Sequence, residues 1–136
     1  MAKPTVTIKQ KVLIPAKPNE VYNSFIDAAK HTALTGAKAT CDARVGGKFT
    51  AWDGYIEGTN LELEKGKRIL QEWKTSEWPT GYAPSTVEFS FRRKNHGTEL
   101  TMIHSKVPRH QANSYRTGWI DFYWKPLKEY FGKRGQ

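Results

Sequence analysis

Four histidines and a single cysteine are the residues whose types could bind a metal or attack a substrate. No metal-ligand spacing joins the histidines, which are His31, His96, His104 and His110, to one another or to an acidic residue on one helix face. Cys41 has no histidine near it in the sequence, so we expect a small hydrophobic residue rather than a nucleophile. A lone cysteine also excludes an internal disulfide and a multi-cysteine zinc site. These residues predict no metal and no cofactor.

Acidic and hydroxyl side chains could instead serve as general acids, bases or nucleophiles. Asp53 lies in a turn signal, and Glu62 and Glu64 share the outward face of one predicted strand. The serines lack the context of a nucleophile elbow. Gly46-Gly47 precedes a predicted strand, whereas a phosphate-binding glycine loop precedes a helix. The sequence therefore predicts no catalytic residue, and we expect a protein that is not an enzyme.

His104 has a second interpretation, because it alternates with Leu100 and Met102 on the apolar face of a predicted strand. As a functional residue it would be a polar anchor or a proton acceptor inside a pocket. As a structural residue it would be a core histidine whose ring nitrogens are bonded within the fold. Both interpretations stay open, and the structural one is favoured.

A pocket that contains His104 could also use side chains of the predicted strand at 68–75. Gln71 and Trp73 share the inward face with Ile69, which would place one polar group on a mostly apolar wall. Aromatic residues at inward positions can act both as core and as pocket wall. The predicted ligand-lining residues are Phe49, Gln71, Trp73, Phe89, Met102, His104, Trp119 and Tyr123.

These residues require a sheet to hold them. Residues 5–14 alternate apolar and polar side chains, which predicts a half-buried strand. Further β-type runs, separated by Gly, Pro, Asn and Asp turn signals, lie at 38–44, 48–52, 55–64, 68–75, 85–93 and 98–107. Consecutive strands joined by short turns indicate a seven-stranded antiparallel meander.

Three helices are predicted around this sheet. Pro18 suits a first helical position, and a second short helix is expected at about 31–35, before Gly36. Residues 111–131 form a long amphipathic pattern, in which Pro126 should kink or divide the helix. The apolar stripe of that pattern comprises Tyr115, Trp119, Phe122, Tyr123, Leu127 and Tyr130. An α+β fold follows, with a curved sheet around the long helix and a cavity between them.

Five segments, in this order and spacing, resemble the activator-of-heat-shock-chaperone ATPase homology family. They are GGKF at 46–49, DGYIEG at 53–58, RILQEWKTSEWP at 68–79, TEL at 98–100 and GWIDFYWKPLKEYFG at 118–132. The resemblance spans nearly the whole chain and implies the helix-grip architecture of the START-like, or birch-pollen-allergen-like (SRPBCC), superfamily. The founding member stimulates the chaperone ATPase with a separate N-terminal domain, which we expect to be absent here because the first strand starts at residue 5.

Length, composition and charge limit which classes of protein and partner remain possible. The 136 residues suit one domain, taken as 1–136, and the sequence lacks an apolar signal segment or a stretch long enough to cross a bilayer. We therefore expect a cytoplasmic protein. The net charge of +9 is spread along the chain rather than clustered, so nucleic acid is not an expected partner.

The leading functional hypothesis is a non-enzymatic binding protein with an apolar cavity between sheet and long helix. It would bind a hydrophobic small molecule or a protein partner, and a stress or chaperone role is implied by the resemblance. One alternative is a partner that activates the chaperone ATPase. Another is a cyclase- or hydrolase-type enzyme of the same superfamily.

Overall fold

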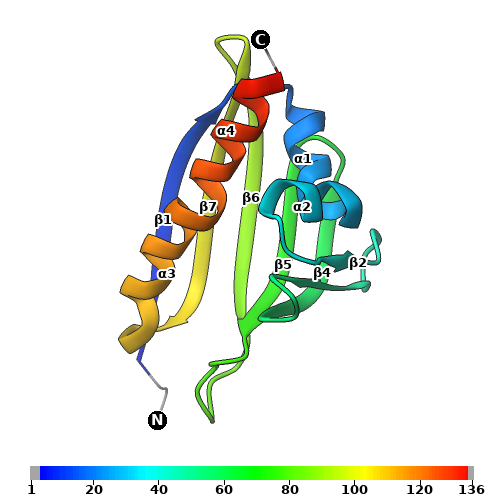
Figure 1. Cartoon of the computed structure of the whole chain (residues 1–136). Coiled ribbons are helices and arrows are strands. Elements are labelled where there is room, and N and C mark those ends of the chain that lie inside the picture. The colour runs from blue at the N-terminus through cyan, green and yellow to red at the C-terminus, as the bar shows by residue number, and fades with distance from the viewer. Residues whose placement is uncertain (1–3, 135–136) are drawn as a thin grey trace.

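The computed structural model describes residues 4–134, in which seven strands form one sheet and the helices lie against it (Figure 1). The strands are β1 Thr5–Ile14, β2 Thr40–Cys41, β3 Lys48–Ala51, β4 Ile56–Glu64, β5 Arg68–Thr75, β6 Ser85–Lys94 and β7 Gly97–Pro108. The α-helices are α1 Pro18–Ile26, α2 Ala28–Thr35, α3 Ala112–Trp119 and α4 Lys125–Arg134. A short 3₁₀ turn η1, Arg109–Gln111, precedes α3, and a π-helical segment η2, Ile120–Trp124, joins α3 to α4.

The sheet order is β1-β7-β6-β5-β4-β3-β2, and every neighbouring pair is antiparallel. The predicted antiparallel sheet is therefore confirmed, including its meander from β2 to β7. The prediction of a strand over 38–44 was too long, because only Thr40 and Cys41 pair with β3. Asp42 leaves the ladder there: its amide bonds to the carbonyl of Lys48 while the chain turns toward Gly47.

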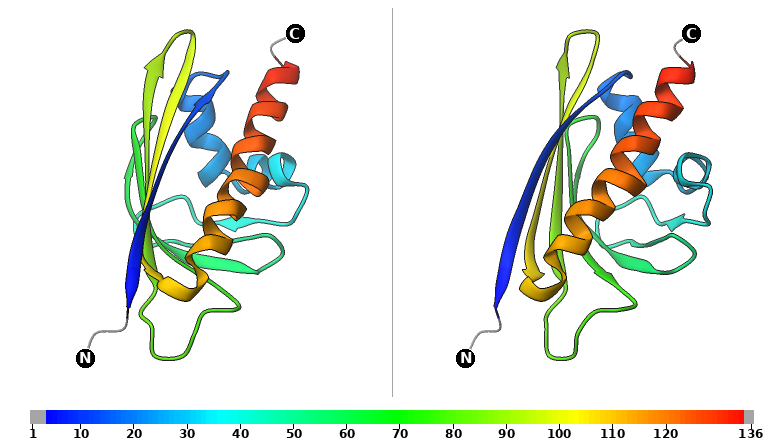
Figure 2. Two further views of the ribbon diagram at one scale, coloured as in Figure 1. Left: turned by 90° about the vertical axis from the view of Figure 1, so that its left-hand side faces the viewer. Right: turned by 60° about the vertical axis from the view of Figure 1, so that its left-hand side comes forward.

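All helices cover the same face of the sheet, and the C-terminal helix runs along it as the longest element (Figure 2). Strands β3 and β4 curl toward this helix (Figure 2). This is the helix-grip arrangement that the sequence predicted. In α2 the helix begins three residues earlier than the predicted 31, because the side chain of Asp27 caps it by accepting from the amide of Lys30 at 3.0 Å.

The bend of the sheet depends on a glycine within a strand. Phe49 in β3, Gly58 in β4 and Trp73 in β5 lie opposite one another across three strands. A Cβ on Gly58 would lie 1.9 Å from the carbonyl oxygen of Glu72 and 2.7 Å from the ring of Phe49. The missing side chain therefore allows β5 and the Phe49 ring to close over β4.

The long helix is divided as predicted, and the division lies just before Pro126. The η2 segment has π geometry, and the amide of Lys125 bonds to the carbonyl of Ile120, five residues back. This extra residue per turn rotates the helix face. It turns Trp124 into the core, where it is 5% exposed, and leaves Phe122 55% exposed. The prediction that Phe122 belongs to the buried stripe was wrong, since a constant α-helical period does not hold through η2.

The core lies between the sheet and the helices. It is aromatic-rich, and its largest fully buried side chains include Phe89, Ile69, Leu100, Met102 and Leu127. Within residues 4–134, the helices fall short of the length and apolar character needed to cross a bilayer.

Candidate functional site

An open groove lies beside the long helix, where strands β3 and β4 curl toward it. Its volume is about 460 Å³. The residues lining it are Trp52, Tyr55, Ile56, Trp73, Ser114, Tyr115, Gly118, Trp119, Phe122 and Tyr123. They come from the turn between β3 and β4, the first residue of β4, strand β5, and α3 with η2. We refer to this space as the aromatic groove.

The turn between β3 and β4 brings Trp52 to the groove through an unusual backbone. Trp52 has φ of 53° and Asp53 has φ of 58°, in the left-handed region that side chains other than glycine rarely adopt. The Asp53 carboxylate helps to hold the turn by accepting from the amide of Lys38 at 3.0 Å. The Trp52 ring packs edge-on against Phe122, with ring centroids 5.4 Å apart. Strain of this kind is found at binding sites more often than elsewhere.

The helix wall of the groove depends on small residues. Ser114, Gly118 and Phe122 follow one another at four-residue intervals, so they line one side of the helix. A Cβ on Gly118 would have only the Phe122 ring near it, at 3.8 Å. The glycine therefore leaves a gap in the helix surface, and the π geometry of η2 places Phe122 at the edge of that gap.

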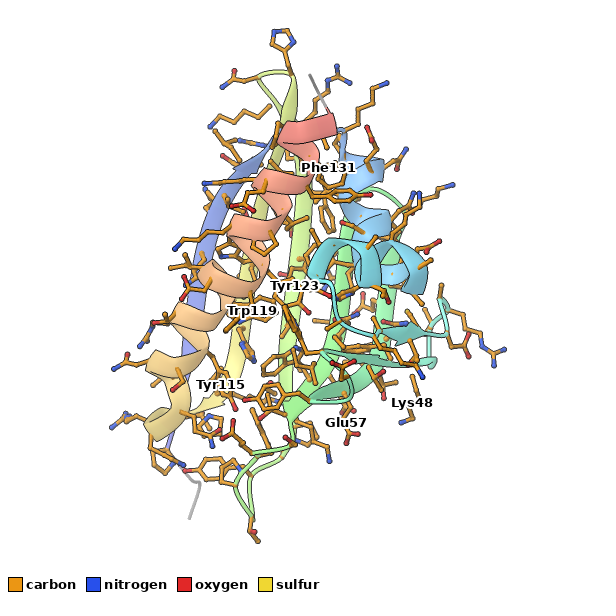
Figure 3. All side chains as sticks on the ribbon, in the orientation of Figure 1. Lys48, Glu57, Tyr115, Trp119, Tyr123 and Phe131 are labelled. Atoms are coloured by element: carbon orange, nitrogen blue, oxygen red, sulfur yellow. The ribbon has the colours of Figure 1, made fainter. Side chains whose placement is uncertain are left out.

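The inner wall of the groove is built from closely packed rings. Figure 3 shows Tyr115, Trp119 and Tyr123 along the helix on the side that faces the strands. Trp73 contacts Tyr115 edge-on at 5.3 Å and Trp119 at 5.6 Å, and Trp119 lies 5.0 Å from Tyr123. Tilted and edge-on contacts of this kind are favourable for aromatic pairs. They also hold the ring faces at differing angles around the groove.

One end of the groove is polar. The Tyr55 hydroxyl donates to the Glu77 carboxylate at 2.5 Å, and Tyr115 donates to Gln111 at 2.9 Å. Tyr115 and Thr75 also share a hydrogen bond of 2.8 Å. Burial, followed by the bond to Glu77, raises the pKa of Tyr55 to about 12. The Tyr55 hydroxyl therefore keeps its proton at neutral pH.

Beneath the groove, the space between helix and sheet is almost filled by side chains. A void of only about 10 Å³ remains, bordered by Phe49, Gln71 and Phe89 together with Phe25 and His31. Trp73, Trp119 and Tyr123 border both this void and the aromatic groove. The larger of the two spaces thus lies at the side of the helix, whereas the sequence predicted a cavity beneath it.

His104 and Met102 border neither space. Both are fully buried, and His104 forms part of a hydrogen-bonded chain within the core. The indole of Trp119 donates to Nδ1 at 3.1 Å, so Nδ1 carries no proton. Nε2 therefore carries the proton and donates to Ser85 Oγ at 2.8 Å, and Ser85 donates to the carbonyl of Trp73 at 2.6 Å. The side-chain polar atoms of Trp119, His104 and Ser85 thus all have partners, and burial lowers the pKa of His104 to about 3.

A second buried histidine, His31, whose burial was not predicted, lies behind the inner wall. The His31 Nδ1 group donates to the carbonyl of Phe25 at 3.4 Å, so Nε2 accepts from the Tyr123 hydroxyl at 2.9 Å. Burial lowers the pKa of His31 and raises the pKa of Tyr123. This bond connects α2 to η2 and fixes the ring of Tyr123 at the groove.

Gln71 also has a structural partner. It is buried at the void and donates to Asn60 Oδ1 at 2.9 Å, and Asn60 in turn donates to the carbonyl of Asp42 at 3.0 Å. The ten described residues that line the aromatic groove carry no charge, and residues 4–134 form no cluster of three His, Cys, Asp or Glu side chains that could hold a metal ion. The arrangement suits the binding of an apolar group.

Of the eight predicted lining residues, three border the groove: Trp73, Trp119 and Tyr123. Sequence reasoning missed Trp52, Tyr55, Ile56, Ser114, Tyr115, Gly118 and Phe122 as lining residues. One signal could have located the helix side. Gly118 interrupts the amphipathic pattern, and it shares a helix face with Ser114 and Phe122. The position of Trp52 depends on a backbone conformation that alternation along a strand does not predict.

Comparison with known proteins gives the family. The profile of the family described as Activator of Hsp90 ATPase homolog 1-like protein matches residues 15–132. The human protein named Activator of 90 kDa heat shock protein ATPase homolog 1 is 34% identical over 129 residues, which is 95% of this chain. A protein of Schizosaccharomyces pombe with no assigned function is likewise 34% identical, over 94% of this chain. The chain spans 38% of the length of each of these two relatives.

Solved structures agree on the architecture. The crystal structure of an Hsp90 activator from Plasmodium falciparum superposes with a TM-score of 0.84 at 27% identity, covering 93% of this chain and 96% of that one. The solution structure of an Aha1 dimer from Colwellia psychrerythraea gives a TM-score of 0.72 at 14% identity, covering 90% and 96%. The second likeness concerns the fold alone.

Proposed function

Because the chain belongs to the Activator of Hsp90 ATPase homolog 1-like family, we propose that it is a chaperone-related binding domain without catalytic activity of its own, located in the cytoplasm. We propose further that the aromatic groove is its site for a small apolar molecule. The observation that carries this second proposal is the groove itself: a space of about 460 Å³, open at the surface and walled mainly by aromatic rings. Most small-molecule sites are concave and apolar with few polar groups, and the groove has these features.

The absence of charge from the lining supports a binding role. General acid–base catalysis needs a titratable group within hydrogen-bond reach of the reacting atom. The polar groups of the lining residues are the hydroxyls of Ser114 and of three tyrosines, Tyr55, Tyr115 and Tyr123, together with the indole N–H groups of Trp52, Trp73 and Trp119. An indole N–H can only donate. The hydroxyls of Tyr55 and Tyr115 are held by Glu77 and Gln111, and burial raises the pKa of all three tyrosines. They can orient a ligand, but they are poor bases at neutral pH.

A ligand in the groove can be tested with variants that fill it. Gly118→Leu should place a side chain in the gap beside Phe122 and abolish binding of apolar molecules that copurify with the wild-type chain. Gly132→Leu is the matched control, because a side chain on this second helical glycine also meets open space, and Gly132 does not line the groove. Native mass spectrometry would follow both variants. Equal retention of the copurified molecule by wild type and Gly118→Leu would contradict the proposal.

The proposed protein partner is the 90 kDa heat shock protein named in the descriptions of the relatives. Calorimetry with purified chaperone should detect binding, and the ATP hydrolysis rate should be measured in the same samples. Binding with an unchanged rate would support a partner role. Binding with a faster rate would support the alternative, an ATPase activator, and no binding would overturn the partner proposal.

A further inference from the structure

The aromatic groove has an unusual electrostatic character within this chain. The protein carries 22 Lys and Arg residues, yet none lies among the ten described residues that line the groove. Seven of those ten residues are aromatic. The face of an aromatic ring carries negative charge density, so rings that surround a space at differing angles make it attractive to a cation. Although the protein as a whole is basic, a groove of this composition should therefore attract a cation.

Two acidic residues are neighbours of residues that line the groove. The Glu77 carboxylate accepts a hydrogen bond from the Tyr55 hydroxyl at 2.5 Å, and a hydroxyl that donates in this way leaves more electron density on its ring. Asp53 follows Trp52 in the turn, where its carboxylate is fixed by the amide of Lys38. Both acidic side chains belong to exposed residues, which contribute long-range attraction without occupying the groove.

The ring geometry fits a rounded group more closely than a flat one. Trp52 and Phe122 are inclined at 69°, and Trp73 and Tyr115 at 89°. Walls that meet at such angles enclose a compact group on several sides, whereas a planar ligand needs two parallel faces. A trimethylammonium group is compact and weakly hydrated, and it presents methyl groups to every ring face.

We propose that the aromatic groove binds a small organic cation of the quaternary-ammonium class. The inference rests on the proposed role of the groove as a small-molecule site and names the class of molecule that it takes. The positive group lies among Trp52, Phe122 and Tyr55, near Glu77, and the apolar remainder extends along Trp73 and Trp119.

The test compares choline with neohexyl alcohol, the uncharged alcohol in which a quaternary carbon replaces the nitrogen. Binding would be followed by NMR of the tryptophan indole N–H signals at low salt. We expect choline to bind about tenfold more tightly, within the range of cation–π effects. Tighter or equal binding of the neutral alcohol would overturn the cation proposal while leaving an apolar site intact. No response of the indole signals to either probe would overturn both the cation proposal and the small-molecule role.

Two variants locate the charge effect. Glu77→Gln removes the carboxylate that is bonded to Tyr55 and leaves every groove-lining side chain in place, so it should weaken choline about threefold and leave the neutral alcohol unchanged. Glu129→Gln makes the same change of charge at an exposed position on α4 and should leave both affinities unchanged. Equal weakening by the two variants would show a general charge effect and contradict the assigned position of the cation. Circular dichroism would verify that both variants fold.

Discussion

His104 is a residue type that often acts in catalysis, but here both of its ring nitrogens form hydrogen bonds within the core. Its two ring nitrogens connect the long helix, through Trp119, to strand β6, through Ser85. The neutral ring is required, because protonation would give Nδ1 a hydrogen that opposes the indole N–H of Trp119. The functional interpretation as a pocket anchor has no support from its position, since His104 borders neither the groove nor the void.

Stability should consequently fall in mild acid. The folded-state pKa of His104 is about 3, below the ordinary value of 6.5, so the unfolded chain binds this proton first as the pH falls. The stabilisation is complete above pH 6.5 and is lost toward pH 3, by up to about 1.4 kcal/mol for each pH unit. His31, whose pKa is also lowered by burial, acts in the same direction.

Urea unfolding at a series of pH values would measure this effect. His104→Gln keeps a hydrogen-bond acceptor but does not titrate, so its stability should depend less steeply on pH than that of the wild type. Parallel pH profiles for the two proteins would show that His104 does not contribute.

Trp119 should contribute strongly to stability. It is 4% exposed, contacts Trp73, Phe89 and Tyr123, and donates to His104. Trp119→Ala should cost about 3–5 kcal/mol in the free energy of unfolding. Phe122→Ala, in the same helix, should cost about 1 kcal/mol or less, because its ring is 55% exposed. Similar losses for both variants would mean that η2 does not turn Phe122 outward.

The alternation of apolar and polar residues predicted correctly which side chains are buried inside regular elements, but not where an element is irregular. It placed Gln71, Trp73 and Ile69 correctly on the buried face of β5, because that strand is regular from end to end. Phe122 was placed wrongly in the buried stripe, and the buried Trp124 was not included in it, because the register of the helix changes within η2. Local periodicity does not report such a change, although Pro126 indicated that one was needed.

At the level of elements, the enclosure of the C-terminal helix by the sheet depends on how sharply β3 and β4 can bend. The sequence supplied the order of the strands, since each turn signal between 38 and 107 is visible in it. Closure of the Phe49 ring and of the β5 backbone over Gly58 could not be inferred, because it requires the pairing register of three strands.

Gly58→Ala should therefore destabilise the fold, by about 2 kcal/mol or more, since the added methyl group would overlap the backbone of β5. Gly132→Ala provides the control. Its added methyl group meets open space in α4, so stability should be unchanged or rise by up to about 1 kcal/mol. Chemical denaturation of both variants measures the difference, and a Gly58→Ala protein as stable as the wild type would show that the sheet can close without this contact.

For the whole molecule, the excess of positive charge is distributed and partly neutralised. Arg68 bonds to Glu62 and Glu88. Arg92 and Lys94 share Glu99, whose pKa is lowered chiefly by its hydrogen bond to Lys94. The remaining Lys and Arg residues are spread along the sequence rather than clustered. Random duplex DNA should therefore bind more weakly than about 1 µM at physiological salt. Fluorescence anisotropy would measure this, and sub-micromolar affinity with a steep salt slope would instead favour a nucleic-acid partner.

The pairing of β1 with β7 has a consequence for biosynthesis. Thr5 lies opposite Pro108 and Ile14 opposite Thr98, so the first strand has no partner until more than eighty residues have followed it. The helix over 112–134 that covers the aromatic face is made later still. Translation adds roughly 5–20 residues per second, so this face stays uncovered for about a second or more after β7 is complete. During its own synthesis the chain should therefore be a transient client for the chaperones that guard nascent proteins.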